Sequence, residues 1–310
     1  MSAPSPPRPA GAASLERLPV TLPRLVEKRA LREPIVMVTA YDHPSARVAE
    51  EAGVDVVLVG DSAAMTVLGY DSTVPVSIEE LLMLTAAVRR GLKTPLLMAD
   101  LPFGSYEASD ELAVATAQRF VKQAGADAVK LEGGGASVRR ARAIVRAGIP
   151  VMGHVGLTPQ TATALGGYRA QGRTAERAIE IARDALELGQ AGCFALVFEA
   201  IPAAVTEALM EKLEIPVVGI GAGSATDGQV LVFHDLLGIG SASSPRFVKR
   251  YADLMGEMVA GVSRYAADVR ERRFPADEHT YSIDPEELER FRAWLDPEPF
   301  GGEDSPVPGW

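Results

Sequence analysis

Short apolar runs alternate along the chain with longer segments whose apolar residues recur every three or four positions. The short runs are rich in Val, Ile and Leu and predict eight buried strands, at residues 35–39, 54–60, 95–99, 128–131, 151–153, 193–198, 216–220 and 229–233. The longer segments predict one-sided helices at residues 78–90, 112–124, 137–147, 174–191 and 203–213. Eight strands in regular alternation with helices predict an α/β protein, a closed (β/α)8 TIM barrel.

Glycines provide two further signals. Gly91, Gly125, Gly148 and Gly192 follow predicted helices, where left-handed C-caps favour glycine. No Gly-x-Gly-x-x-Gly motif follows the first predicted strand, which disfavours an open dinucleotide-binding sheet.

The two ends of the chain differ from its middle. The first residues are rich in Pro, Ala and Ser and contain no apolar segment of a secretory signal, so residues 1–20 are expected to be a disordered tail. The catalytic barrel is expected at 21–275, followed by an acidic extension at 276–310. Within that extension, Asp284-Pro-Glu-Glu287 predicts the start of a short helix that ends near Leu295.

Composition excludes several classes of partner. The net charge of −10 and the pI near 5.1 argue against nucleic acid or an anionic membrane surface. No apolar run reaches the length of about 20 residues that spans a bilayer. The only cysteine, Cys193, excludes an internal disulfide and is interpreted as a small buried residue. These features predict a cytoplasmic protein that acts on small molecules.

Five of the apolar runs end in charged or histidine side chains, which are costly to bury alone. These residues are Asp61, Asp100, Lys130 with Glu132, His154 and Glu199. A TIM barrel builds its active site where the carboxyl ends of its strands converge. The pattern therefore predicts one shared site.

Asp61 and Asp100 end neighbouring strands. Alone, each could cap a helix, although Asp100 precedes Leu-Pro and is poorly placed for that. Together, two crowded carboxylates repel each other unless a proton or cation lies between them. A hard cation that prefers oxygen ligands is expected, and Mg²⁺ is the commonest.

Lys130 and Glu132 lie two residues apart in a strand, so both face the barrel axis and Leu131 faces the helices. They could form an internal ion pair without chemistry. Alternatively, Glu132 joins the metal site and Lys130 binds an anionic group of the substrate.

His154 and Glu199 end the next two strands. His154 is either a hydrogen-bonded core residue or a substrate contact. Glu199 lies among apolar residues and too early to cap the following helix, so it is the candidate general base.

Two glycine-rich segments are less specific. Residues 219–224 follow the seventh strand, where many barrels bind phosphate, but the motif is weak. Residues 166–173 contain Arg169 and Arg173 and could form a lid, an anion contact or a turn at a subunit interface.

Eight blocks resemble the ketopantoate hydroxymethyltransferase family in order and spacing. They are Thr39-Ala-Tyr-Asp42, Leu58-Val-Gly-Asp-Ser62, Asp71-Ser-Thr-Val-Pro75, Ala99-Asp-Leu-Pro102, Val129-Lys-Leu-Glu-Gly-Gly134, Gly153-His-Val-Gly-Leu-Thr-Pro-Gln160, Gly166-Gly-Tyr-Arg-Ala-Gln-Gly-Arg173 and Gly219-Ile-Gly-Ala-Gly-Ser-Ala-Thr-Asp-Gly-Gln229. The resemblance runs from about residue 22 to about residue 274. Both terminal tails fall outside it.

The resemblance implies a barrel of the phosphoenolpyruvate/pyruvate type that needs Mg²⁺ and assembles as a decamer, a pentamer of dimers. It implies transfer of a hydroxymethyl group from 5,10-methylenetetrahydrofolate to 3-methyl-2-oxobutanoate, giving 2-dehydropantoate for pantothenate and coenzyme A synthesis. It assigns the metal to Asp61, Asp100 and Glu132, and the keto acid to Asp61, Ser62, Asp100 and Lys130. Glu199 becomes the proton acceptor, and Arg169 or Arg173 is expected near the folate glutamate tail.

Three other functions remain open from the sequence. A Mg²⁺-dependent lyase of the same superfamily would cleave a C–C bond in an oxo-acid or hydroxy-acid. An aldolase would use Lys130 as a Schiff-base nucleophile. A non-enzymatic interaction protein would not need ionisable residues at five strand ends.

Overall fold

The computed structural model describes residues 17–240 and 245–295. The first sixteen residues of the predicted N-terminal tail, and residues 296–310, lie outside this part of the chain. The chain divides into two compact units, Met1–Leu254 and Met255–Trp310.

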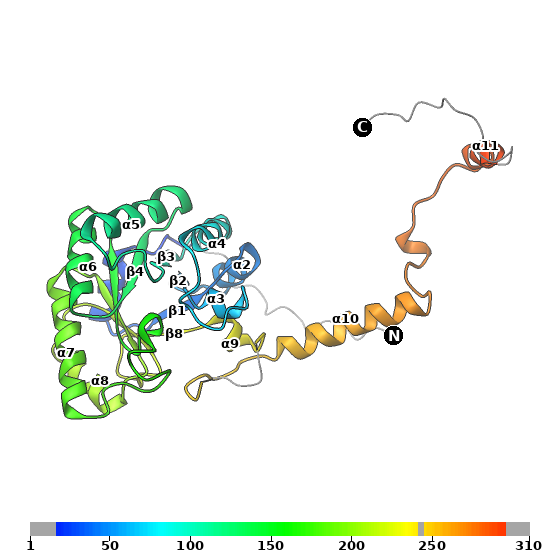
Figure 1. Cartoon of the computed structure of the whole chain (residues 1–310). Helices are drawn as coiled ribbons and strands as arrows, with labels where there is room; N and C mark the ends of the chain where they lie inside the picture. Colours follow the sequence, from blue (N-terminus) through cyan, green and yellow to red (C-terminus); the bar gives the residue numbers. More distant parts are fainter. Residues whose placement is uncertain (1–16, 241–244, 296–310) are drawn as a thin grey trace. The chain divides into compact units, whose positions relative to one another are not determined.

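The first unit is a closed barrel of eight parallel strands (Figure 1). Each strand pairs with the next, and β1 pairs with β8 to close the sheet. All eight predicted strands are present: β1 (Ile35–Thr39), β2 (Val56–Val59), β3 (Leu96–Asp100), β4 (Ala128–Glu132), β5 (Val151–Gly156), β6 (Ala195–Glu199), β7 (Val217–Ile220) and β8 (Gly228–Leu231). The predicted TIM barrel is confirmed.

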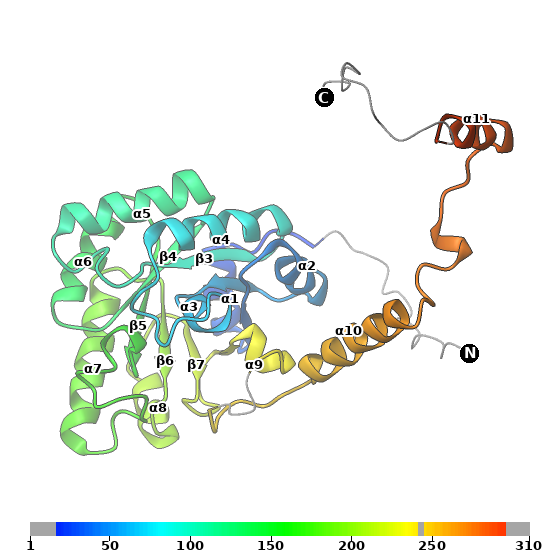
Figure 2. The same ribbon diagram turned by 45° about the vertical axis from the view of Figure 1, so that its right-hand side comes forward.

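Helices surround these strands (Figures 1 and 2). The helices of this unit are α1 (Leu22–Ala30), α2 (His43–Ala52), α3 (Ala63–Thr66), α4 (Ile78–Gly91), α5 (Asp110–Ala124), α6 (Ala136–Arg146), α7 (Ala175–Gln190), α8 (Ala203–Met210) and α9 (Phe233–Leu237), with a short 3-10 helix at Pro159–Thr161. The five predicted helices correspond to α4–α8. Sequence patterning missed α1, α2, α3 and α9.

Three of the four predicted glycine caps have the expected left-handed backbone. Gly125 caps α5 with φ of 74°, and Gly148 and Gly192 have φ of 86° and 98°. The prediction for Gly91 is wrong, because this residue is still helical and ends α4. A Cβ at Gly91 would lie 2.7 Å from the Cβ of Ala46, so the glycine allows α2 and α4 to pack closely.

Because side chains alternate along each strand, one apolar layer lies between the strands and the helices and another lies inside the barrel. A layer of polar side chains follows the inner one at the carboxyl end of the barrel. Outward side chains such as Leu131 pack under the helices, and inward side chains such as Met98 fill the barrel. Near the carboxyl ends of β3–β6, the last inward side chain on each strand is ionisable instead. The site is therefore a direct consequence of the period-two pattern.

The second unit is described by itself. It contains α11 (Pro285–Leu295) and nearly all of α10 (Leu254–Arg270), which begins at the last residue of the first unit. The Asp284 carboxylate accepts a hydrogen bond from the Glu286 N–H at 2.9 Å, as the helix prediction requires. Because α10 falls almost wholly within this unit, the assignment of residues 255–275 to the barrel domain stays a prediction. In the described part of the chain, no helix combines the length and apolar character that crossing a bilayer requires.

Candidate active site

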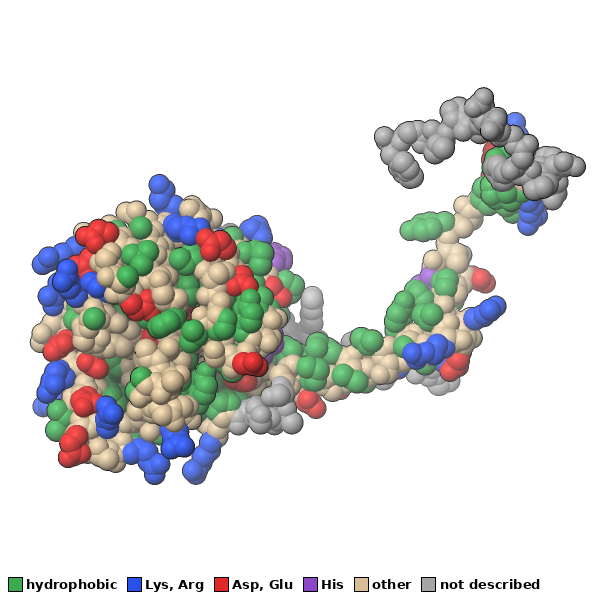
Figure 3. Space-filling model, viewed as in Figure 1, with side chains coloured by type: hydrophobic (Ala, Val, Ile, Leu, Met, Phe, Trp, Pro, Cys, Tyr) green, Lys and Arg blue, Asp and Glu red, His purple; other side chains and the backbone are tan. Residues whose placement is uncertain are grey.

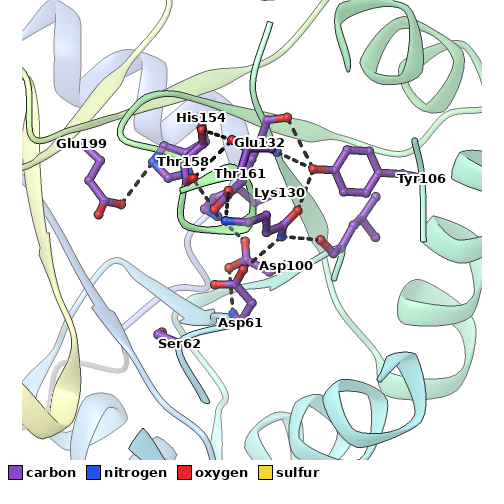
Figure 4. Close-up of polar contacts among 12 residues, drawn as sticks. Asp61, Ser62, Asp100, Tyr106, Lys130, Glu132, His154, Thr158, Thr161 and Glu199 are labelled. Carbon is purple, nitrogen blue, oxygen red and sulfur yellow. Dashed lines mark hydrogen bonds and ion pairs between the residues drawn. The ribbon is translucent and has the colours of Figure 1, made fainter. Parts of the chain in front are cut away.

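The predicted polar residues meet at the carboxyl end of the barrel (Figure 4). Strand register explains their order: Asp100 on β3 pairs with Lys130 on β4, and Glu132 pairs with His154 on β5. Asp61 follows β2, and Glu199 is the last residue of β6. The predicted convergence on one site is confirmed.

Lys130 lies between acidic groups of two strands. Its ammonium forms a close ion pair with Asp100 Oδ1 and lies 4.0 Å from Glu132 Oε1. Asp100 Oδ2 accepts a hydrogen bond of 2.9 Å from the Asp61 N–H. The expected contact between Lys130 and Glu132 is therefore longer than the ion pair between Lys130 and Asp100 on the neighbouring strand. Spacing along one strand could not reveal that second pair.

His154 connects the two remaining carboxylates. Its Nδ1 lies 3.2 Å from Glu132 Oε1, and its Nε2 lies 3.2 Å from Glu199 Oε2. His154 is thus buried between the candidate metal ligand and the candidate base. It does not stand apart as an independent core residue.

Burial and neighbouring charges shift the pKa values of these groups. Burial, reinforced by Glu132 and Asp100, raises the pKa of Asp61 to about 8. Burial opposes the charged forms of His154 and Lys130, but acidic partners outweigh it, raising the pKa of His154 to about 9 and that of Lys130 above its usual range. Burial likewise opposes ionisation of Glu132, yet hydrogen bonding to His154 leaves its pKa lowered. A lysine held so firmly in its charged form is a poor Schiff-base nucleophile.

These shifts predict that the metal-free protein loses stability as pH rises. The folded pKa of His154 exceeds the ordinary 6.5, so its contribution is complete below that pH and is lost as pH rises through about 9. Asp61 changes the stability in the same direction as pH rises. Its folded state retains a proton that an ordinary aspartate with pKa 3.8 releases. Urea unfolding without metal should give a lower unfolding free energy at about pH 8 than at about pH 5, and Asp61→Asn should reduce that difference. An unchanged pH dependence in the variant would contradict this assignment.

The donor set suits a hard cation in its chemistry. Asp61, Asp100 and Glu132 are all buried, and their carboxylate oxygens are the kind of ligand that a hard cation prefers. In residues 17–240 and 245–295, no three His, Cys, Asp or Glu side chains form a preassembled metal site. The Lys130 ammonium already pairs with Asp100 and approaches Glu132, so binding an ion would require these side chains to rearrange. Their role as metal ligands stays a proposal.

The other predicted residues lie at the rim or away from the site. Ser62 adjoins Asp61, and its hydroxyl lies 2.8 Å from the Tyr41 hydroxyl. Arg169 and Arg173 are exposed on the glycine-rich loop, where Tyr168 contacts Met65. No helix begins after Gly219-Ile-Gly-Ala-Gly223, so this loop lacks the helix N-terminus that favours phosphate binding.

Two residues without an assigned role belong to the site. Gln160 and Tyr106 are buried and contact the acidic cluster through hydrogen bonds. Gln160 lies within a block that resembles the family, but periodicity gives no signal for a loop residue. Cys193 is buried away from this chemistry, and burial raises its pKa to about 12.

Solved structures of other proteins share the barrel fold of this chain. Phosphonopyruvate hydrolase in complex with oxalate and Mg²⁺ covers 88% of this chain and 97% of its own, with a TM-score of 0.55 and 15% identity. Phosphoenolpyruvate phosphomutase from Streptomyces platensis subsp. rosaceus covers 86% and 97%, with a TM-score of 0.53 and 18% identity. At these identities the likeness shows the fold alone.

Sequence comparison shows the family. Residues 19–277 match the model of the family described as ketopantoate hydroxymethyltransferase. A 3-methyl-2-oxobutanoate hydroxymethyltransferase from Carboxydothermus hydrogenoformans is 51% identical, over 87% of this chain and 98% of the relative. One from Moorella thermoacetica is 52% identical, over 86% and 99%. The chain belongs to the ketopantoate hydroxymethyltransferase family, as its motifs predicted.

Proposed function

We propose that this protein transfers a hydroxymethyl group from 5,10-methylenetetrahydrofolate to 3-methyl-2-oxobutanoate, with Mg²⁺, and forms 2-dehydropantoate. The observation that carries the proposal is membership of the family together with the convergence of its matching acidic residues at one barrel end. The product belongs on the route to pantothenate and coenzyme A.

The buried charges favour an anionic substrate that accompanies a cation. Asp61, Asp100 and Glu132 would hold Mg²⁺, and Asp61, Ser62, Asp100, Lys130 and His154 would surround the keto acid. When bound, Mg²⁺ would draw electron density from the substrate carbonyl and stabilise negative charge on its oxygen. Lys130, freed from Asp100 as the ion enters, would offset the substrate carboxylate.

Glu199 is the proposed base that would remove the proton from C3 of the keto acid. Its carboxylate stands at the end of β6, with its side chain 16% exposed, and faces His154. Acidic partners, acting against burial, raise the pKa of His154 to about 9, and His154 would orient Glu199 through Nε2. C3 would then form a C–C bond to the methylene carbon of the folate, and water would supply the hydroxyl group on that carbon. Both bonds from that carbon to the folate nitrogens would break, the proton from C3 and one from water would pass to the nitrogens, and tetrahydrofolate would leave.

The direct test combines the purified protein with Mg²⁺, 3-methyl-2-oxobutanoate and 5,10-methylenetetrahydrofolate. Mass spectrometry should find 2-dehydropantoate, and formation of the product should require all three additions. Cleavage of an oxo-acid without folate would instead favour a lyase.

Assembly and location follow from the family resemblance and are proposed with it. We infer a cytoplasmic homodecamer built as a pentamer of dimers. An exposed apolar stripe on α10, formed by Met258, Val259, Val262 and Tyr265, supports packing of this helix against other protein (Figure 3). Light scattering should give ten times the chain mass of 32.8 kDa.

Asp100→Ala should sharply raise the Mg²⁺ concentration that activity requires. The change removes a proposed ligand and also the ion-pair partner of Lys130. Activity measured against Mg²⁺ concentration checks the prediction, with Asp110→Ala on the outer helix α5 as control. An unaltered metal requirement would remove Asp100 from the proposed metal site.

A further inference from the structure

We propose that Gln160, oriented by Tyr106, is a positioning residue that fixes the carboxylates of Asp61 and Glu132 relative to each other. The inference rests on the proposed function for its purpose, which is to set the spacing of two metal ligands. The hydrogen bonds that carry it are independent of that function. Both residues are almost fully buried, with Gln160 5% and Tyr106 2% exposed.

Gln160 contacts both carboxylates through different groups. Its side-chain Nε2 donates to Asp61 Oδ2 at 3.0 Å, and its backbone N–H donates to Glu132 Oε2 at 3.0 Å. Nε2 also donates to the Leu101 carbonyl oxygen at 3.0 Å, just after β3. Gln160, in the segment that follows β5, thereby connects groups at the carboxyl ends of β2, β3 and β4.

Tyr106 fixes the orientation of the Gln160 amide. The tyrosine hydroxyl donates to Gln160 Oε1 at 2.8 Å, and it accepts from the Glu132 N–H at 3.3 Å. The opposite amide orientation would point Oε1 at the Leu101 carbonyl oxygen, which offers no proton, and would point NH₂ at Tyr106. Both donors and the acceptor of the Gln160 side chain are therefore satisfied in only one arrangement.

Strand pairing alone does not fix the orientation of the Asp61 and Glu132 carboxylates. Register fixes Cα positions in β2–β4, whereas a carboxylate can rotate about its side-chain torsions. Asp61 and Glu132 repel each other once both are ionised, as they would be around a bound cation, so donors that hold them limit this rotation. Gln160 supplies such donors without adding a positive charge that would repel a bound cation.

The test uses the full chain and three single variants. Gln160→Met removes the side-chain hydrogen bonds at similar size, Tyr106→Phe removes only the orienting hydroxyl, and Thr161→Val is the control. Thr161 lies beside Gln160 but bonds within its own loop to Thr158. Calorimetric titration of the metal-free protein with Mg²⁺ gives the affinity, and thermal unfolding gives the stability.

Gln160→Met should weaken Mg²⁺ binding about 10- to 100-fold, the usual effect of losing a partner of a metal ligand. Tyr106→Phe should weaken it less, and the double variant should match Gln160→Met because Tyr106 acts through Gln160. Thr161→Val should leave the affinity unchanged. Lower thermal stability with unchanged Mg²⁺ affinity in both variants would overturn the proposal, because the residues would then be structural only.

A structural readout keeps this inference separate from the proposed function. Crystal structures of metal-free wild type and Tyr106→Phe or Gln160→Met should differ in the Asp61–Glu132 carboxylate spacing by about 1 Å or more. If the wild type binds no Mg²⁺, the metal role fails and these structures alone decide the positioning role. Unmoved carboxylates in every variant that folds would contradict it.

Discussion

Glu199→Gln is expected to bind Mg²⁺ and 3-methyl-2-oxobutanoate normally yet lose hydrogen exchange at C3 of the keto acid. Glutamine keeps the size of the side chain and an oxygen that faces His154, but it cannot accept the substrate proton. Removing a general base typically slows reaction about 10²- to 10⁴-fold. Exchange is measured by NMR in deuterated water, with substrate affinity followed by calorimetry.

Glu207→Gln provides the matched control for this change. Glu207 lies on α8, shortly after β6, and is exposed. The Glu207→Gln variant should exchange hydrogen at C3 of the keto acid at the wild-type rate. Rapid exchange in Glu199→Gln would show that another group removes the proton.

Lys130→Met should produce the largest loss of stability among single changes in the site. The substitution leaves the buried Asp100 carboxylate without its ammonium partner and removes positive charge near Glu132. Breaking a buried pair in this way typically costs about 3–5 kcal/mol. Urea unfolding without metal should show that loss, and added Mg²⁺ should recover part of it by replacing the charge.

Lys28→Met separates this effect from ordinary loss of an ion pair. Lys28 on α1 pairs with Asp55 at 2.7 Å, at the start of β2 and so at the opposite end of the barrel. That variant should lose less stability, and Mg²⁺ should not restore it. Equal losses, or equal recovery with Mg²⁺, would contradict the charge balance assigned to the site.

The barrel could be predicted because parallel strands buried on both faces are continuous apolar runs. The missed helices lack so clear a pattern. Helix α2 depends on a capping box between Asp42 and Ser45 and on close packing of small residues against Gly91. Such packing is a property of two segments together, and the pattern within either one does not reveal it.

That the charged residues at the strand ends would converge could be predicted, but the pairing among them could not. Period-two alternation placed Lys130 and Glu132 on one face, yet the register of neighbouring strands determines that Lys130 meets Asp100. The position of His154 between two carboxylates depends on the same register. Gln160 lies in the short 3-10 helix after β5 and Tyr106 in a loop, where neither period applies and only the folded backbone brings them to the acidic groups.

We propose that acidic side chains at the barrel mouth hold a divalent cation against the keto acid. A crystal structure with Mg²⁺ and 3-methyl-2-oxobutanoate tests it most directly. The ion should lie among Asp61, Asp100 and Glu132, at about 2.0–2.1 Å from those that bind it directly, with Lys130 turned from Asp100 toward the substrate carboxylate. Keto acid bound in the barrel with no ion beside these carboxylates, and Lys130 still paired with Asp100, would contradict the claim.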